Sequence, residues 1–285
     1  MDSVRFAVVG DLHVGAVAEE VQTAIDLVNT QPLDFVLFLG DLVHEATDEN
    51  IEEFVRQAGR IDKPVYLTLG NHDVGRAEEG FDFEDKIGRA WPGPWSDSFT
   101  YAFQAGEWSF VVGGLASGTL PFAGVQVNHH KGFVSETGGY LYMQGRHLER
   151  FGELLEATGD RPTCAVTHVP LVRMAERVHA RGCYDQVHLL EEIQILSLLE
   201  ARANVKMALS GHQHFNQVDV VRGRLHCVTQ GVRGYGPYGD PSAIRIVELS
   251  AGRVHSHLFW PGLPPQPPAP ISTLAGDCRF QWQFG

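Results

Sequence analysis

The feature that most constrains the fold of this sequence is a series of short apolar runs, each ending abruptly in a polar cluster. The runs are a few residues long and rich in Val, Phe and Leu, and glycine or polar residues bound them, which is typical of buried central strands. They span Val4–Val9, Phe35–Leu39, Val65–Leu69, Cys164–Val166 and Val205–Leu209. Because ligands bind at the carboxyl ends of the strands in an open α/β sheet, we expect the polar clusters to gather there.

Segments with helical spacing lie between these runs. For example, Val21, Ile25 and Val28 recur on one face of a helix. The alternation of strand and helix in the first part of the chain indicates βαβ units and a largely parallel sheet. The predicted helices span Ala18–Asn29, Glu49–Arg60, Tyr140–Thr158 and Val187–Ala203.

Pairs of neighbouring apolar runs joined by glycine-containing turns predict β-hairpins in the middle and late parts of the chain. These pairs are Phe99–Gln104 with Trp108–Val112, Gln217–Val221 with Leu225–Thr229, and Ala243–Leu249 with Val254–Leu258. We therefore expect a second, more antiparallel sheet stacked on the first, within a single domain over residues 1–260.

Residues 261–285 form a proline-rich and then aromatic tail. The stretch PGLPPQPPAP begins at Pro261, and its prolines predict that it enters neither a sheet nor a helix. It is read either as a simple strap over the surface or as an arm that packs on a neighbouring subunit through Phe280, Trp282 and Phe284. The second interpretation predicts a homo-oligomer.

Charge, cysteine usage and the lack of long apolar segments argue against a protein that binds duplex nucleic acid, is stabilised by disulfides or spans a membrane. The net charge of −13 argues against duplex nucleic acid as a partner, because binding to its backbone needs a basic face. The four cysteines form no CxxC pair and are read as reduced thiols. The sequence contains no run of about 18 apolar residues and no secretory signal, so we predict a cytoplasmic protein without a membrane span.

The polar clusters share one chemical character. Carboxylates, imidazoles and an amide oxygen are ligands for divalent transition metals, and histidine disfavours a pure Ca²⁺ or Mg²⁺ site. Each cluster alone is also compatible with a turn or a strand cap, but their joint occurrence after successive strands indicates one metal site. The candidate ligands are Asp11, His13, Asp41, Asn71, His168, His212 and His214.

The order of these motifs, from about residue 5 to about residue 260, resembles that of the calcineurin-like metallophosphoesterases. The motifs are Asp11-Leu12-His13, Gly40-Asp41, Gly70-Asn71-His72-Asp73, His168 and Gly211-His212-Gln213-His214. The resemblance implies a four-layer α/β/β/α sandwich of two stacked mixed sheets. It is greatest for the small phosphodiesterase branch, which acts on cyclic nucleotides and glycerophosphodiesters.

The resemblance also implies a ligand set for two metal ions, with Asp41 bridging them. One ion would be held by Asp11, His13, Asp41 and His214, and the other by Asp41, Asn71, His168 and His212. A hydroxide shared by the ions would attack the phosphorus atom. His72 would assist the leaving group, and Asp73 would fix the tautomer of His72.

Three residues outside the motifs are candidates for substrate binding. His44 could overhang the cleft or be a surface or capping residue. Arg233 could reach a phosphate and Tyr235 could stack on a base or sugar, although a glycine-rich surface loop is an equal interpretation of this segment.

These observations predict an enzyme that hydrolyses a small phosphodiester with two divalent transition-metal ions, from among Mn, Fe, Zn and Co. The alternatives are a phosphomonoesterase or protein phosphatase of the same fold, and a binding scaffold without catalysis.

Overall fold

Two seven-stranded sheets form the centre of the described part of the chain. A computed structural model describes residues 3–74, 83–95, 99–114, 145–171, 192–234, 241–250, 252–263, 269–270, 274–275 and 279–283. The strand order of the first sheet is β12-β14-β11-β10-β1-β2-β3, and that of the second is β13-β8-β9-β7-β6-β5-β4.

The first sheet is mixed. Parallel pairing joins β1 to β2 and β2 to β3, whereas β10 pairs antiparallel with both β1 and β11. Its strands are β1 (Val4–Val9), β2 (Phe35–Leu39), β3 (Val65–Thr68), β10 (Ile244–Ser250), β11 (Arg253–Phe259), β12 (Ala269–Pro270) and β14 (Arg279–Gln283).

The second sheet is also mixed. Its central strands β5, β6, β7 and β9 are parallel neighbours, and the hairpins β4–β5 and β8–β9 are antiparallel. The strands are β4 (Tyr101–Ala105), β5 (Trp108–Val112), β6 (Thr163–Val166), β7 (Val205–Ser210), β8 (Gln217–Val221), β9 (Arg224–Val228) and β13 (Leu274–Ala275). All three predicted hairpins are confirmed, and so are the two stacked mixed sheets.

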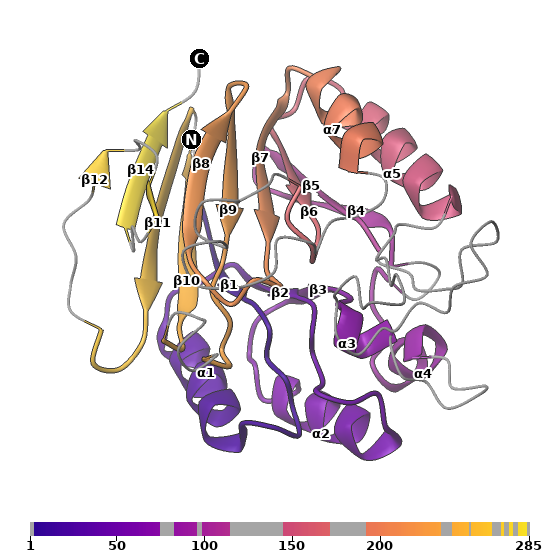
Figure 1. The fold of residues 1–285 in the computed structure, drawn as a ribbon, viewed down its shortest axis with the longest axis vertical. Helices are drawn as coiled ribbons and strands as arrows, with labels where there is room; N and C mark the ends of the chain where they lie inside the picture. The colour runs from indigo at the N-terminus through magenta and orange to yellow at the C-terminus, as the bar shows by residue number, and fades with distance from the viewer. Residues whose placement is uncertain are drawn as a thin grey trace, which may run out of the picture.

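Helices cover the outer faces of the two sheets. Figure 1 shows α1 and α2 on one side of the molecule and α5 and α7 on the opposite side, with the strands between them. The four-layer α/β/β/α sandwich expected from the sequence is therefore confirmed. The described helices are α1 (Ala18–Thr30), α2 (Asp48–Ala58), α3 (Asn71–Val74), α4 (Phe83–Ala90), α5 (Gly145–Ala157) and α7 (Glu192–Glu200).

The core between the sheets is aromatic. Phe6 of β1 meets Phe110 of β5 edge to face, with ring centroids 5.4 Å apart, and stacks on Phe35 of β2 at 4.6 Å. A smaller apolar cluster lies beneath α5 and α7, where Phe151 and Ile195 are fully buried. Each sheet is thus buried on both faces, which explains why its central strands are continuous apolar runs.

The predicted helices form for identifiable local reasons. In α2, the Thr47 side chain caps the backbone N–H of Asn50 at 3.2 Å, and Ile51 and Phe54 are buried. The predictions for α1 and α2 are right to within two residues at each end. Residues 140–144 and 187–191, the predicted starts of the other two helices, lie outside the described residues. The helix α4 was not predicted from the sequence.

The C-terminal tail contributes strands to both sheets, contrary to part of the prediction. Residues Arg279–Gln283 pair antiparallel with β11, and Leu274–Ala275 pairs with β8. The proline-rich stretch enters a sheet at its last two residues, Ala269–Pro270, which form the edge strand β12. An edge position tolerates proline because no neighbour on the outer side needs its missing N–H. The oligomer and the domain boundary at 260 stay predictions.

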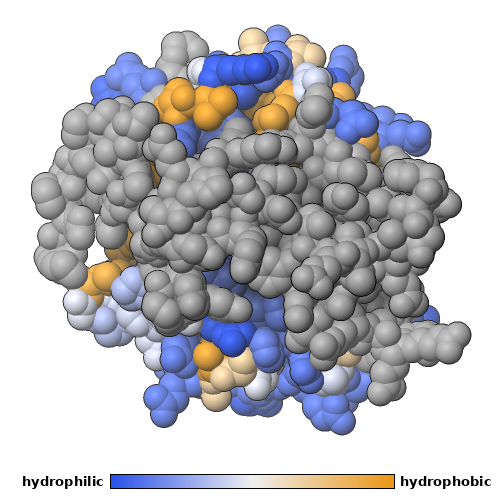
Figure 2. Space-filling model, viewed as in Figure 1, coloured by the Kyte–Doolittle hydropathy of each residue, from blue (hydrophilic) through white to orange (hydrophobic). Residues whose placement is uncertain are grey.

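The described part of the face drawn in Figure 2 is mostly hydrophilic. Figure 2 shows hydrophilic residues over most of the described part of this face, with apolar residues in small groups. Among the described helices, none is long and apolar enough to cross a bilayer. Cys164 and Cys227 are buried free thiols, as predicted, whereas the other two cysteines lie outside the described residues.

Candidate metal centre

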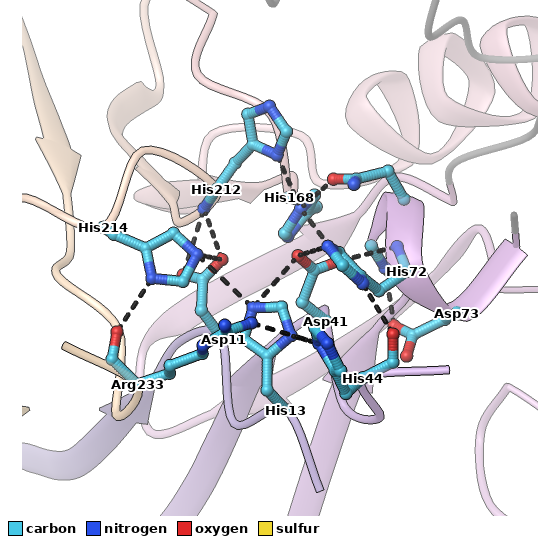
Figure 3. Close-up of polar contacts among 12 residues, drawn as sticks. Asp11, His13, Asp41, His44, His72, Asp73, His168, His212, His214 and Arg233 are labelled. Carbon is cyan, nitrogen blue, oxygen red and sulfur yellow. Dashed lines mark hydrogen bonds and ion pairs between the residues drawn. The ribbon is translucent and has the colours of Figure 1, made fainter. Parts of the chain in front are cut away.

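All of the candidate metal ligands come together where strands of the two sheets end (Figure 3). From the first sheet, Asp11 and His13 follow β1, Asp41 follows β2, and Asn71 begins α3 after β3. From the second sheet, His168 follows β6, and His212 and His214 follow β7. The site therefore spans both sheets, and parallel strands with aligned carboxyl ends place its members together.

The backbone at most of these positions has an unusual conformation. Asp11, His13, Asp41, His212 and His214 have φ angles of 47°, 49°, 50°, 69° and 50°. Side chains with a Cβ rarely adopt this left-handed region, and such residues cluster at functional sites. The chain thus turns sharply at each of these five ligands, and this turn directs the side chain into the space beyond the strand ends.

The first group of ligand atoms comes from Asp11, His13, Asp41 and His214, and all of these atoms lie within 4.8 Å of one another. His13 Nε2 is 3.5 Å from Asp41 Oδ2 and 3.3 Å from His214 Nε2. The Nδ1–H of His214 donates to the carbonyl of Arg233 at 2.8 Å. Because that bond holds the ring proton on Nδ1, Nε2 presents its lone pair to the group.

The second group comes from Asp41, Asn71, His168 and His212. His168 Nε2 lies 3.1 Å from Asn71 Oδ1, 3.0 Å from His212 Nδ1 and 3.4 Å from Asp41 Oδ1. The Nδ1–H of His168 donates to the Leu39 carbonyl at 2.6 Å, so Nε2 carries a lone pair here too. Asp41 faces the first group with Oδ2 and the second with Oδ1, which is the arrangement of a bridging carboxylate.

This donor set fits cations. Lone pairs of nitrogen and oxygen converge at 3.0–3.5 Å, a packing that a positive ion between them relieves. Burial lowers the pKa of His13, His212 and His214, which keeps these rings neutral and able to coordinate. Mixed N and O donors suit Mn, Fe, Co or Zn.

Burial acts to raise the pKa of both buried carboxylates, Asp11 and Asp41, but their neighbours lead to opposite net shifts. Burial raises the pKa of Asp11 to about 8, with the neighbouring Asp41 carboxylate adding to the rise. Burial also acts to raise the pKa of Asp41, but electrostatic interaction with the surrounding histidine rings, above all His168 and His72, outweighs it and holds that pKa below the ordinary value. Asp41 is therefore the permanently ionised centre of the cluster.

His72 lies beside the metal ligands with one nitrogen directed toward them. Its Nδ1–H donates to the carbonyl of His44 at 2.7 Å, and its Nε2 is 4.0 Å from Asp41 Oδ2. The backbone N–H of His72 donates to Asp41 Oδ1 at 2.9 Å, which ties the catalytic candidate to the bridging ligand. Nε2 is thus the atom that can face a substrate.

The predicted role of Asp73 is wrong. Its carboxylate accepts from the backbone N–H groups of Gly70 at 2.8 Å and Val43 at 3.1 Å, and it is fully buried. The His44 carbonyl fixes the His72 tautomer instead. Burial raises the pKa of Asp73 well above its ordinary value. Asp73 therefore holds together the two loops that carry Asp41 and His72.

His44 and Arg233, both predicted as substrate-binding residues, meet at the edge of the first group. Arg233 donates from its guanidinium to His44 Nδ1 at 3.1 Å, and the same nitrogen is 3.3 Å from His13 Nδ1. The His44 ring stacks on His72 with centroids 5.1 Å apart. Because arginine only donates, His44 Nδ1 accepts and its proton lies on Nε2. Tyr235 lies outside the described residues.

Backbone carbonyls set the tautomers of the histidine rings, and none of them was predicted from the sequence. Leu39, His44 and Arg233 each supply a carbonyl oxygen that accepts from one histidine of the site. No sequence signal reveals such contacts, because every residue type offers a carbonyl. They are nonetheless the outer partners that orient metal-binding imidazoles.

Comparisons with known proteins agree with this architecture. A family model described as calcineurin-like phosphoesterase matches residues 4–216. A dimetal phosphatase from Danio rerio has a similar structure, with a TM-score of 0.67 and 14% identity, and 99% of each chain is covered. No curated protein matches the chain by sequence.

Two further solved structures share the fold. Purple acid phosphatase PPD1 from yellow lupin (Lupinus luteus) has a TM-score of 0.62 at 14% identity, over 99% of this chain and 54% of that one. GAP50 of Plasmodium, described as the anchor in the inner membrane complex, has a TM-score of 0.59 at 13% identity, over 100% and 90% of the two chains. At these identities the likeness concerns the fold alone.

Proposed function

Because the chain belongs to the calcineurin-like phosphoesterase family, we propose that it hydrolyses a small phosphodiester, such as a cyclic nucleotide or a glycerophosphodiester, at a two-metal centre. One observation carries the proposal: Asp41 presents one carboxylate oxygen to each of two groups of converging lone pairs. When bound, a pair of divalent ions would supply an activated water and stabilise the charge on the phosphate oxygens.

The chain's own residues would provide orientation and proton transfer. Asp41 would fix the spacing of the two cation sites, and the His44 carbonyl would keep the proton of His72 on Nδ1. In its imidazolium form, His72 would then donate the Nε2 proton to the leaving oxygen of the ester and be left as the neutral ring with its proton on Nδ1. Such general acid catalysis contributes about 10²- to 10⁴-fold to the rate.

Substrate recognition would involve Arg233 and His44. The Arg233 guanidinium lies against His44 at 3.1 Å, and its five N–H groups suit the oxygen atoms of a phosphate. The stacked rings of His44 and His72 form one wall beside it. We propose that this wall and Arg233 bind the phosphate ester beside the metal ions, with Tyr235 as a further candidate for stacking.

The experiment compares bis(p-nitrophenyl) phosphate with p-nitrophenyl phosphate on protein loaded with Mn²⁺, Fe²⁺, Co²⁺ or Zn²⁺. We expect kcat/KM to favour the diester by at least about tenfold, which corresponds to about 1.4 kcal/mol in the activation free energy. A preference for the monoester would replace the proposal with a phosphomonoesterase or protein phosphatase of the same fold.

A binding scaffold is the alternative outside catalysis, since the structurally similar GAP50 is described as an anchor. Metal analysis distinguishes the two functions. The enzyme is expected to hold two ions per chain, because both groups of ligand atoms are complete. The scaffold would be supported by a protein that is loaded with Mn²⁺, Fe²⁺, Co²⁺ or Zn²⁺, loses all metal when the free ions are dialysed away, and hydrolyses neither ester.

A further inference from the structure

Arg245 is a fully buried arginine whose hydrogen bonds link the two sheets. It lies on β10 opposite Val8 of β1, and its side chain is 0% exposed. Its guanidinium donates to Ser256 Oγ at 2.9 Å, to Thr229 Oγ1 at 3.3 Å and to Asn216 Oδ1. Ser256 belongs to the first sheet, whereas Asn216 and Thr229 border strands of the second.

The three acceptors are themselves buried. Asn216 is 1% exposed, Thr229 is 0% exposed and Ser256 is 2% exposed. A buried guanidinium loses several kcal/mol of hydration free energy, so its hydrogen bonds must be kept for the fold to tolerate it. The planar fork of arginine also fixes the directions in which its partners lie. Arg245 therefore defines where Asn216 and Thr229 sit.

Asn216 ends the loop that carries two metal ligands. Residues 211–216 form no regular secondary structure, and both His212 and His214 have left-handed backbone angles. At the start of the loop, the N–H of Gly211 donates to the His168 carbonyl at 2.9 Å. At its end, the side chain of Asn216 is held by Arg245. Because this loop has no regular backbone hydrogen bonding of its own, its conformation depends on such hydrogen bonds at both ends.

Thr229 begins a second connection to the ligands. The chain continues to Gly231, where an added Cβ would lie 2.8 Å from Asp11 Cβ and 3.0 Å from His214 Nδ1. This backbone packs directly on two ligands, and the carbonyl of Arg233 just beyond it holds His214. A displacement of Thr229 would therefore also move the backbone that packs on Asp11 and His214, the ligands of the first group.

We propose that Arg245 is a positioning residue of the metal centre. Through Asn216, it holds the loop of His212 and His214 against the ligands of the first sheet. The inference rests on the proposed metal centre and adds a residue that contacts neither the ions nor the substrate. Loss of such outer support typically lowers metal affinity about 10- to 100-fold.

The test measures the affinity of the full chain for Mn²⁺ or Zn²⁺ by competition with a chromophoric chelator. R245K keeps the charge but loses the fork, and N216A removes the acceptor on the metal loop. We expect each variant to lose about 10- to 100-fold in affinity. The double variant should bind metal no more weakly than R245K alone, because N216A removes the partner of a contact that R245K has already lost.

Matched variants separate positioning from general stability. N216D retains an acceptor for Arg245 and is expected to keep the affinity of the unchanged protein. S256A removes a hydrogen bond of the same guanidinium on the β11 side, so we expect a lower free energy of unfolding of the metal-free protein with unchanged metal affinity. If R245K does not fold, N216A and N216D still decide the question.

The possible failures are distinguishable. Metal affinities of N216A and R245K equal to that of the unchanged protein, with only their unfolding free energies lowered, would overturn the positioning role. An unchanged protein that binds no metal would instead overturn the proposed function on which it rests.

Discussion

Replacing Gly70 with alanine should disable the metal centre. Gly70 follows β3 immediately before ligand Asn71, and a Cβ there would lie 2.2 Å from Asp41 Oδ1 and 2.8 Å from His168 Cε1. Carbon and oxygen atoms that are not bonded approach to roughly 3.3 Å, so one partner must move by about 1 Å. The N–H of Gly70 donates to Asp73 Oδ2 at 2.8 Å, and this bond holds the Gly70 backbone in place. The Asp41 carboxylate is therefore the group that has to move.

A shift of this size in the bridging carboxylate affects both cation sites. We expect metal affinity to fall about 10- to 100-fold and turnover of bis(p-nitrophenyl) phosphate to fall about 10²-fold. The overpacking itself should lower the free energy of unfolding by about 1–3 kcal/mol. Chelator competition, steady-state kinetics and urea unfolding of the metal-free protein measure the three effects separately.

Gly152 provides the matched control. It lies within α5, where an added Cβ would meet Leu198 Cδ2 at 3.5 Å, an ordinary van der Waals contact. Alanine there should raise the free energy of unfolding by about 0.5–1 kcal/mol and leave metal affinity unchanged. A G70A protein that binds metal and turns over as the unchanged protein does would refute the steric reasoning.

Three further changes test separate parts of the site and the fold. H72A should retain its metal and lose about 10²- to 10⁴-fold in kcat, as measured by metal analysis and steady-state kinetics. An unchanged kcat would contradict a catalytic role for His72. R233K loses the guanidinium fork that lies against His44, so KM for the diester should rise by roughly tenfold with metal content unchanged; an unaltered KM would contradict a role in substrate binding. Burial, with the charge of Arg224 as a second cause, lowers the pKa of His226 to about 4 from the ordinary 6.5. The unfolded chain thus binds more protons between these values, and the stability due to neutral His226 is lost as the pH falls from about 6.5 to about 4. The loss is on the order of 3 kcal/mol in the free energy of unfolding, and H226Q should not show it. Urea unfolding of the two metal-free proteins at pH 4.5 and 7 measures the difference, and an equal pH dependence of both would contradict the prediction.

The central strands could be predicted because their burial leaves a plain pattern. Phe35–Leu39 is apolar and buried throughout, Val4–Val9 is so except at Arg5, and the predicted bounds are those of β1 and β2. The candidate ligands could be proposed for a related reason. They follow these runs directly, so the strand ends alone place them at one edge of the sheets.

The remaining features depend on contacts between distant segments. The proline-rich stretch gives no sign that the chain after it returns to pair as β14 with β11. The strand β12 consists of only Ala269–Pro270, which is too short to leave a sequence pattern. Asp73 follows His72 in the sequence, yet its carboxylate points to the backbone of Gly70 and Val43. Adjacent positions on a short helix face different ways, so sequence proximity gave the wrong partner for that ring.

The packing of the two sheets and the metal centre depend on each other. Ligands such as Asp11 come from the first sheet, and His168 and His214 come from the second, so only the stacked sheets assemble the full set. The left-handed backbone at Asp11 and His214 costs on the order of 1–3 kcal/mol at each residue, and surrounding structure must hold it. The pKa of Asp11, raised to about 8 by burial, adds the cost of keeping a buried carboxylate ionised. A cation favours that carboxylate, and because it binds only the folded arrangement, it stabilises the sheet packing that created its site.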